Sequence, residues 1–298
     1  MVCSVDDPRD LPGVHAHLVS SALLPAERLR HLLYSPIWDG ESAHFDVRGE
    51  PASHGVAVTD SRLLISRDFH RRGRPPALFS VPFEHILYVE LGTALLLGWF
   101  AIRFAAGGRL ASVCLLFEAT VGAEHFSSAV RAFRAAVGSR CRPHGGRACI
   151  PWSEVWNRVT PYQARNLAPL LFDGERPIAA IGSRLSWGLR RRFLGRAPVR
   201  VADDGTLVVT DLGVLYVMTE PDIRPDLWSF GVNVWTVPHD AIRCAAIVGA
   251  ASRWRPLRRV RLTLARNQVT TAIEVPFDET CAESASGLVR ILGEGPAR

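Results

Sequence analysis

The chain contains no lysine, so all 35 of its Lys and Arg residues are arginine. Sulfur-containing residues are few, with 2 Met and 6 Cys, and the cysteines do not have the spacing of a disulfide framework. The most apolar run, 91–104, is interrupted by two glycines and is too short to span a bilayer. The N-terminus, MVCSVDDPRDLPG, lacks the apolar stretch of a secretory signal. These absences predict a cytoplasmic protein with reduced cysteines.

The sequence also lacks the short motifs of common catalytic sites. No GxSxG, P-loop or HExxH motif occurs, and no two carboxylates are predicted to share a face. Cys141, His144 and Cys149 occur together in a glycine-rich segment, but a fourth zinc ligand is missing. His15 and His17 belong to a proline-flanked N-terminal segment that we expect to be mobile. We therefore predict a protein that is not an enzyme, with no cofactor and no bound metal.

The composition is that of a folded globular protein with a basic surface. Hydrophobic residues make up 48% of the chain and charged residues 21%. At 298 residues the chain is long enough for two cores of ordinary size. The net charge is +6, and guanidinium groups suit phosphate and carboxylate, so an acidic partner such as a membrane surface or nucleic acid is consistent with the charge.

Several short motifs occur twice, in the same order. The pairs are LLPAE and LFDGE, AVTDSRLLI and VVTDLGVLY, FSVPFEHI and WTVPHDAI, and VRAF and VRIL. Such a series predicts an internal duplication. The segment 138–152 is rich in Gly, Pro and Arg and separates the copies. We predict a first domain at 1–138, a linker with a short helix at 139–165, and a second domain at 166–298.

Hydrophobic periodicity predicts the same elements in each half. The predicted strands lie at 43–48, 55–60, 62–67, 77–83, 85–91, 98–105 and 110–117, and at 197–202, 206–211, 213–219, 233–238, 241–249, 256–265 and 268–277. A helical period then begins in both halves. Its apolar positions are Phe126, Ala129, Val130, Phe133 and Val137 in the first half, and Ala282, Ala285, Val289 and Leu292 in the second. The predicted fold class is mainly β with α: seven antiparallel strands and one C-terminal helix, twice.

This order resembles the pleckstrin-homology-like (PH-like) roll, in particular its bacterial and GRAM-like variants. The resemblance rests on the glutamate of LLPAE, the hairpin from Gly55 to Leu63, the segment from Phe79 to Ile86 and the closing helix, with matching positions in the second copy. It implies two rolls of packed antiparallel sheets, each capped by its helix, and roles in membrane attachment or protein scaffolding. Lipid-binding members hold phosphate with a basic first loop, whereas the matching loops here, RGEPASHG and ADDGT, are neutral or acidic.

Three arginine clusters are candidate sites for an anionic surface. They comprise Arg67, Arg71, Arg72 and Arg74; Arg190, Arg191 and Arg192; and Arg253, Trp254, Arg255, Arg258 and Arg259. The alternative is that these are ordinary solvated loops in a chain whose only basic side chains, apart from histidine, are arginines.

The turn TALLLGW is a candidate contact with a partner or a membrane, because an exposed apolar patch usually marks an interaction site. Its residues are Leu95, Leu96, Leu97 and Trp99. The alternative is that these side chains enter the core.

The favoured hypothesis is a cytoplasmic, non-catalytic adaptor or scaffold that binds a protein partner and, as a peripheral protein, an anionic membrane. A self-assembling homo-oligomeric module and a nucleic-acid binder acting through the arginine-rich loops are the alternatives.

Overall fold

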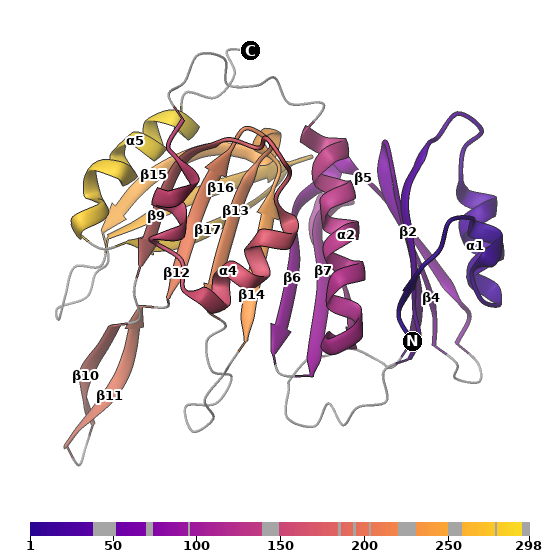
Figure 1. The fold of residues 1–298 in the computed structure, drawn as a ribbon, viewed down its shortest axis with the longest axis horizontal. Helices are drawn as coiled ribbons and strands as arrows, with labels where there is room; N and C mark the ends of the chain where they lie inside the picture. Colours follow the sequence, from indigo (N-terminus) through magenta and orange to yellow (C-terminus); the bar gives the residue numbers. More distant parts are fainter. Residues whose placement is uncertain are drawn as a thin grey trace.

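The computed structural model describes residues 1–37, 52–69, 74–94, 96–138, 149–183, 186–192, 195–202, 204–219, 231–249, 258–277 and 279–293, with only the backbone at 186–192 and 195–202. The fold is mainly β, with antiparallel sheets and a few helices (Figure 1). No helix in these ranges is both long enough and apolar enough to cross a membrane.

The first sheet is formed by the N-terminal part of the chain, in the order β1-β2-β3-β4-β5. Its strands are Cys3–Ser4, Leu29–Ser35, Ser53–Thr59, Arg62–Asp68 and Ala77–Pro82. Helix α1 (Val14–Ala22) covers its outer face, where Val19 packs with Leu32 and Leu64. The prediction of a mobile N-terminus was therefore wrong, because His15 lies in this helix and is 2% exposed.

The central sheet contains strands from both halves of the chain, in the order β8-β7-β6-β14-β13-β12-β9. The first half contributes β6 (Ile86–Ala94), β7 (Leu97–Ala106) and β8 (Arg109–Glu118). The second half contributes β9 (Pro177–Ser183), β12 (Gly205–Thr210), β13 (Val214–Thr219) and β14 (Val232–Val237). Strands β10 (Ser186–Arg192) and β11 (Gly195–Ala202) form a separate hairpin.

The third sheet follows the central one along the chain, in the order β15-β16-β17. Its strands are Ile242–Gly249, Arg258–Arg266 and Val269–Phe277. Helix α5 (Ala282–Gly293) packs on this sheet and buries Ala285, Leu288 and Leu292. Ala282 and Val289 pack at the rim of the same core, so the predicted apolar face of this helix is confirmed.

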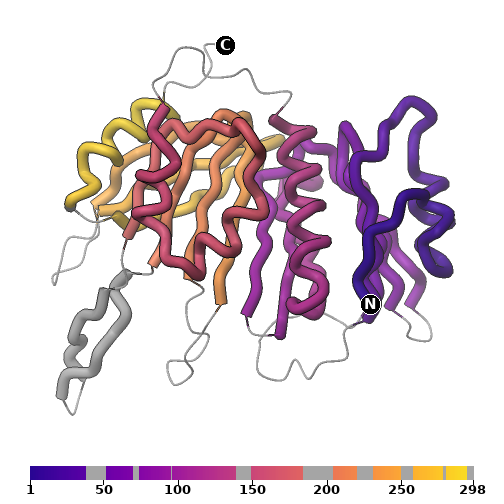
Figure 2. Tube along the Cα trace, in the orientation of Figure 1, coloured from indigo at the N-terminus to yellow at the C-terminus, as the bar shows by residue number. Residues whose placement is uncertain are grey.

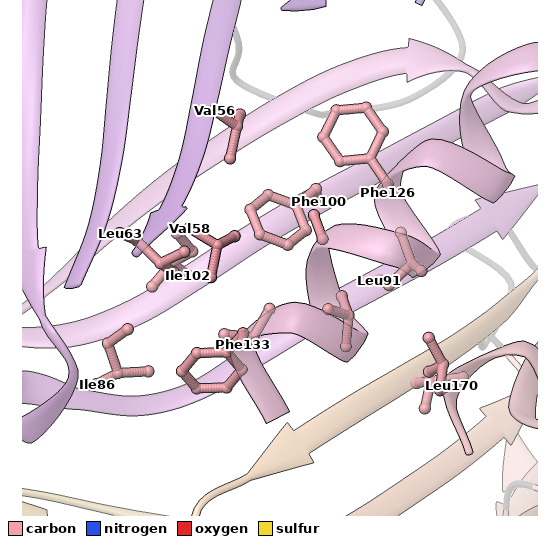
Figure 3. Packing of buried hydrophobic residues seen from close by; sticks show 14 of the residues in the cluster. Val56, Val58, Leu63, Ile86, Leu91, Phe100, Ile102, Phe126, Phe133 and Leu170 are labelled. Atoms are coloured by element: carbon pink, nitrogen blue, oxygen red, sulfur yellow. The ribbon is translucent and has the colours of Figure 1, made fainter. Parts of the chain in front are cut away.

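Helix α2 (Ala119–Gly138) ends the first half and lies between the first sheet and strands β6 to β8 (Figure 1). Its predicted apolar face is confirmed, because Phe126, Ala129, Val130, Phe133 and Val137 are all buried. In Figure 3, Phe126 of this helix lies beside Phe100 of the central sheet, and Phe133 lies toward Ile102 of the same sheet and Val58 of the first sheet.

The segment between the halves forms helices α3 (Trp152–Trp156) and α4 (Pro161–Leu167). Thr160 and Gln163 form a capping box at the start of α4. Leu167 and, after it, Leu170 belong to the same core as the aromatic residues of α2. Short 3₁₀ turns complete the fold, at Pro8–Asp10, Phe83–His85, Ala168–Leu170, His239–Ala241 and Glu279–Cys281.

Strand β6 pairs antiparallel with β14 and thereby joins the two halves into one sheet. The pairs run from Thr93 with Val232 to Val89 with Thr236. Figure 2, coloured along the chain, shows the purple strands of the first half beside the orange strands of the second at this joint. The backbone hydrogen bonds of a strand pair require fixed spacing, so the two halves are held in one orientation.

Motifs that occur twice in the sequence make the same hydrogen bonds in the structure. The Glu27 carboxylate accepts a bond from the Leu24 amide, and that of Glu175 accepts one from the Phe172 amide. The threonine hydroxyl of each TD turn donates to the carbonyl three residues later, at 3.0 Å in both copies. The duplicated letters therefore mark duplicated local structure.

Most predicted strands match observed ones. The predicted strand 43–48 lies outside the described residues. The observed strands β1, β2, β9 and β10 were not predicted. Strand β2 lacks a clean period of two because both of its faces are covered, with Leu32 packing toward α1 and Leu33 toward α2.

Candidate functional site

The first arginine cluster is only partly described, and Arg67 within it is engaged inside the fold. The Arg67 guanidinium donates to the Cys114 carbonyl at 2.8 Å and to Nε2 of His54 at 3.1 Å. Arg74 is exposed, and its guanidinium lies 4.1 Å from the centre of the Phe69 ring. Arg71 and Arg72 lie outside the described residues.

The other two arginine clusters lie on different elements. Arg190, Arg191 and Arg192 are in strand β10, of which the backbone is described. Arg253, Trp254 and Arg255 lie outside the described residues. Arg258 is exposed at the start of β16, and the adjacent Arg259 forms an ion pair with Glu274 at 2.9 Å. Arg67 thus lies in the first sheet and Arg258 and Arg259 lie in the third, and these two sheets are at opposite ends of the molecule in Figure 1.

The apolar turn between β6 and β7 is split between surface and core. Leu96 is 62% exposed, whereas Leu97 is 2% exposed and belongs to the core. Trp99 is half-buried, and its indole N–H donates to Glu90 at 2.9 Å. Leu95 lies outside the described residues. Of the described candidates in this turn, only Leu96 offers a large exposed apolar side chain.

A buried polar network connects α1 to the first sheet. The two ring nitrogens of His15 lie 2.9 Å from the Ser66 hydroxyl and 2.8 Å from the Ser53 hydroxyl. Both serines are almost completely buried, which gives the network a structural role in fixing α1. No group of three or more His, Cys, Asp and Glu residues suitable for a metal occurs in the described parts of the chain.

His54 lies next to this network and is held neutral. Burial, followed by the nearby Arg67 guanidinium and His15, lowers the pKa of His54 to about 3. Since the Arg67 Nε–H group can only donate, Nε2 of His54 accepts, and the neutral ring carries its proton on Nδ1. His54 is therefore an uncharged acceptor that orients Arg67 toward strand β8.

Strand β15 is an outer strand of the third sheet and carries several exposed side chains. Its sequence, IRCAAIVG, contains one charged residue, Arg243. Within the described residues the strand pairs with β16 alone, and a register irregularity between Ile242 and Cys244 sets Arg243 apart. Cys244, Ala246 and Ile247 are exposed, the last at 37%.

The outer edge of β15 has no backbone hydrogen-bond partner in the described part of the chain. Exposed strands usually avoid unwanted pairing by carrying charges, prolines or bulges along their length. From Cys244 to Gly249, β15 has neither a charge nor a proline. This stretch is an uncharged strand edge to which no described strand is paired, although helix α5 packs against β15.

The corresponding strand of the first half is β6, and it is covered. The motifs VPFEHI and VPHDAI align Ile86 with Ile242, and these residues begin β6 and β15, respectively. Strand β14 occupies the edge of β6, and the Asn233 amide of β14 donates to Glu90 of β6 at 2.6 Å. The alignment places Ala246 of β15 at the position of Glu90.

Some other outer strands carry isolated features that hinder pairing. The outer strand β17 carries Glu274 and Pro276, and the β8 carbonyl of Cys114 accepts a bond from Arg67. At β9 the carbonyl of Pro177 accepts from the Ile150 amide. Strand β5 (ALFSVP) has no charged residue, and no strand in the described ranges pairs with its outer side. Among the described outer strands longer than two residues, β15, β5 and β9 (PIAAIGS) thus carry no charged residue.

Comparison with known proteins adds no family. No protein-family model matches the chain, and the curated proteins contain no match to its sequence. The candidate site therefore rests on the geometry of β15. Sequence analysis predicted this strand but not its open edge. The feature of the sequence that could have indicated this edge is the uncharged run CAAIVGA, which lacks the alternation of polar and apolar residues that is typical of a half-exposed strand.

Proposed function

We propose that this chain is a non-catalytic scaffold of two PH-like rolls that binds a protein partner by strand addition at β15. The observation that carries this proposal is the uncharged outer edge of β15, whose counterpart β6 is covered by β14. In strand addition, main-chain hydrogen bonds supply affinity and alternate side chains supply specificity.

The order of elements supports the two-roll architecture. Strands β2 to β8 precede helix α2 in the first half, and strands β9 to β17 precede helix α5 in the second. Each helix buries an apolar face against the strands of its own half. A shared central sheet gives such a pair of modules a fixed geometry, which suits a scaffold that must present binding surfaces at constant spacing.

The chemistry of the edge favours a protein partner over an anionic surface. Along β15 only Arg243 is charged, and the exposed side chains of Ala246 and Ile247 are apolar. An anionic lipid or nucleic-acid backbone is recognised by clustered cations, whereas an apolar strand edge is recognised by another strand. The arginine clusters remain a separate prediction, tested by co-sedimentation with anionic and neutral vesicles at two salt concentrations.

A strand peptide tests the proposal directly. The probe is a soluble, fluorescently labelled peptide containing VNVWTV, the β14 sequence that covers the corresponding edge. We expect saturable binding to the dilute full-length chain, measured by fluorescence anisotropy. Ala246→Lys places a charge on the edge and should weaken binding ten-fold or more.

The matched control is Ala106→Lys, the same substitution at the exposed last residue of β7. It should bind the peptide like the unmodified chain. Equal binding by all three proteins, or no binding to the unmodified chain, would overturn the proposal. Circular dichroism of both variants establishes that they are folded.

A further inference from the structure

We infer that the strand added to β15 is β5 of a second copy of this chain. This inference rests on the proposed function and names the partner of the same edge. The pairing of β6 with β14 inside the chain supplies the geometry. Strand β6 follows the VP motif of the first half, and β14 ends at the VP motif of the second half.

Each chain also contains one strand that aligns with β6 and one that aligns with β14. By the aligned VP motifs, β15 of the second half corresponds to β6, and β5 of the first half corresponds to β14. Strands β5 and β15 each pair on one side only within the described chain. The joint that holds the halves together therefore has an unused counterpart: β15 on one copy and β5 on the next.

The internal register predicts which residues would face each other between copies. In the joint, Val234 pairs with Leu91 and Trp235 with Glu90. The residues aligned with these are Leu78 and Phe79 on β5, and Ile247 and Ala246 on β15. Applying the same register between two copies gives four transferred pairs: Ala77 with Val248, Leu78 with Ile247, Phe79 with Ala246, and Ser80 with Ala245.

These transferred pairs are chemically compatible. Three of the four join apolar side chains, and none contains a charge. Ile247 and Ala246 are exposed, while Leu78 and Phe79 are half-buried, so pairing would remove apolar surface from water on both strands. Arg243, the one charged residue of β15, lies outside the four pairs. Strand β5 of a second copy supplies an uncharged partner sequence.

The predicted contact is heterologous, because different surfaces of the two copies meet. Such contacts leave one free β15 and one free β5 on every dimer, so assembly continues until a ring closes or a filament forms. We therefore expect the mean molar mass in light scattering to rise with protein concentration beyond that of two chains. Ala246→Lys should shift this rise to at least ten-fold higher concentration, and Ala106→Lys should not.

Cysteine cross-linking tests the register. In a background with Cys3, Cys141, Cys149 and Cys244 replaced by serine, one chain carries Leu78→Cys and another carries Ile247→Cys. The two remaining cysteines are shielded: Cys114 is half-buried, with the pKa of its thiol raised to about 11 by burial, and Cys281 is buried. Mild oxidation of the mixture should give a covalent dimer of the two different chains.

The register control replaces Ile247→Cys with Val248→Cys, whose side chain lies on the opposite face of the strand and should cross-link to Leu78→Cys at least ten-fold less. Cross-linking of the Ile247→Cys chain alone would show β15 pairing with β15 and overturn the inference. A chain that stays monomeric and does not cross-link also overturns it. If that monomer still binds the VNVWTV peptide, the proposed function stands without the second copy. If it does not, both fail.

Discussion

Removal of the Arg134 charge should destabilise the chain more than any comparable arginine substitution in the first half. Arg134 of α2 forms an ion pair with Glu175, and the two side chains are 1% and 0% exposed. The Arg134 guanidinium also donates to the Leu170 carbonyl. In Arg134→Met the Glu175 carboxylate would remain buried with the Phe172 amide as a donor but without a cation. Breaking a buried pair in this way costs about 3–5 kcal/mol.

The matched control is Arg62→Met, which removes the cation from the duplicated glutamate, Glu27. That carboxylate keeps the hydroxyls of Thr59 and Ser61 as donors, each at 2.6 Å, and its arginine is 17% exposed. With these donors retained, the loss should be about 1–2 kcal/mol.

Urea unfolding followed by tryptophan fluorescence measures both free energies of unfolding. The double variant Arg134→Met with Glu175→Met should recover most of the loss, because replacing a buried ion pair by apolar side chains is often neutral. The reasoning would be refuted by equal losses for Arg134→Met and Arg62→Met, or by a double variant as unstable as the sum of its single changes.

Two further predictions concern the first half. The pKa of His54 is about 3 in the folded chain and near 6.5 when unfolded, so the unfolded state binds more protons between these values. The His54 contribution to the unfolding free energy should fall by up to about 1.4 kcal/mol per pH unit as the pH drops from 6.5 toward 3, and His54→Gln should remove this slope in urea titrations. In the central sheet, a methyl group on Gly92 would overlap the Trp99 ring, so Gly92→Ala should lower the thermal midpoint by overpacking worth about 1–3 kcal/mol. Gly287→Ala in α5, where a methyl group meets no atom within 4 Å, should instead raise the midpoint through helix propensity; a lowered one would contradict this.

Local periodicity predicted the elements that have one covered face. The apolar positions of α2, from Phe126 to Val137, are spaced as one face of a helix and are buried as one. Strand β2 was missed because Leu32 and Leu33 pack into different cores on its two faces, which leaves no alternation to detect. Helix α1 was missed because its main buried contacts, such as those of His15 with Ser53 and Ser66, are with residues far along the chain.

The candidate site could be predicted only in part, for the same physical reason. The uncharged sequence of β15 is visible in the chain, but whether its edge is open depends on which strands pair across the halves. The pairing of β6 with β14 brings Glu90 and Asn233 together, and no local pattern indicates such a contact. The sequence also left open whether Leu97 and Trp99 form an exposed patch or enter the core, and the structure buries the first and half-buries the second.

Hydrogen–deuterium exchange of the backbone amides along β15 tests the central claim most directly. In dilute solution the outward amides of residues 242–249 should exchange fast, while those of β6 and β14, which lie inside the central sheet, should exchange slowly. Raising the protein concentration should slow exchange at 242–249 and 77–82 together. Slow exchange along the whole of β15 in dilute solution, equal to that of β6, would contradict the account.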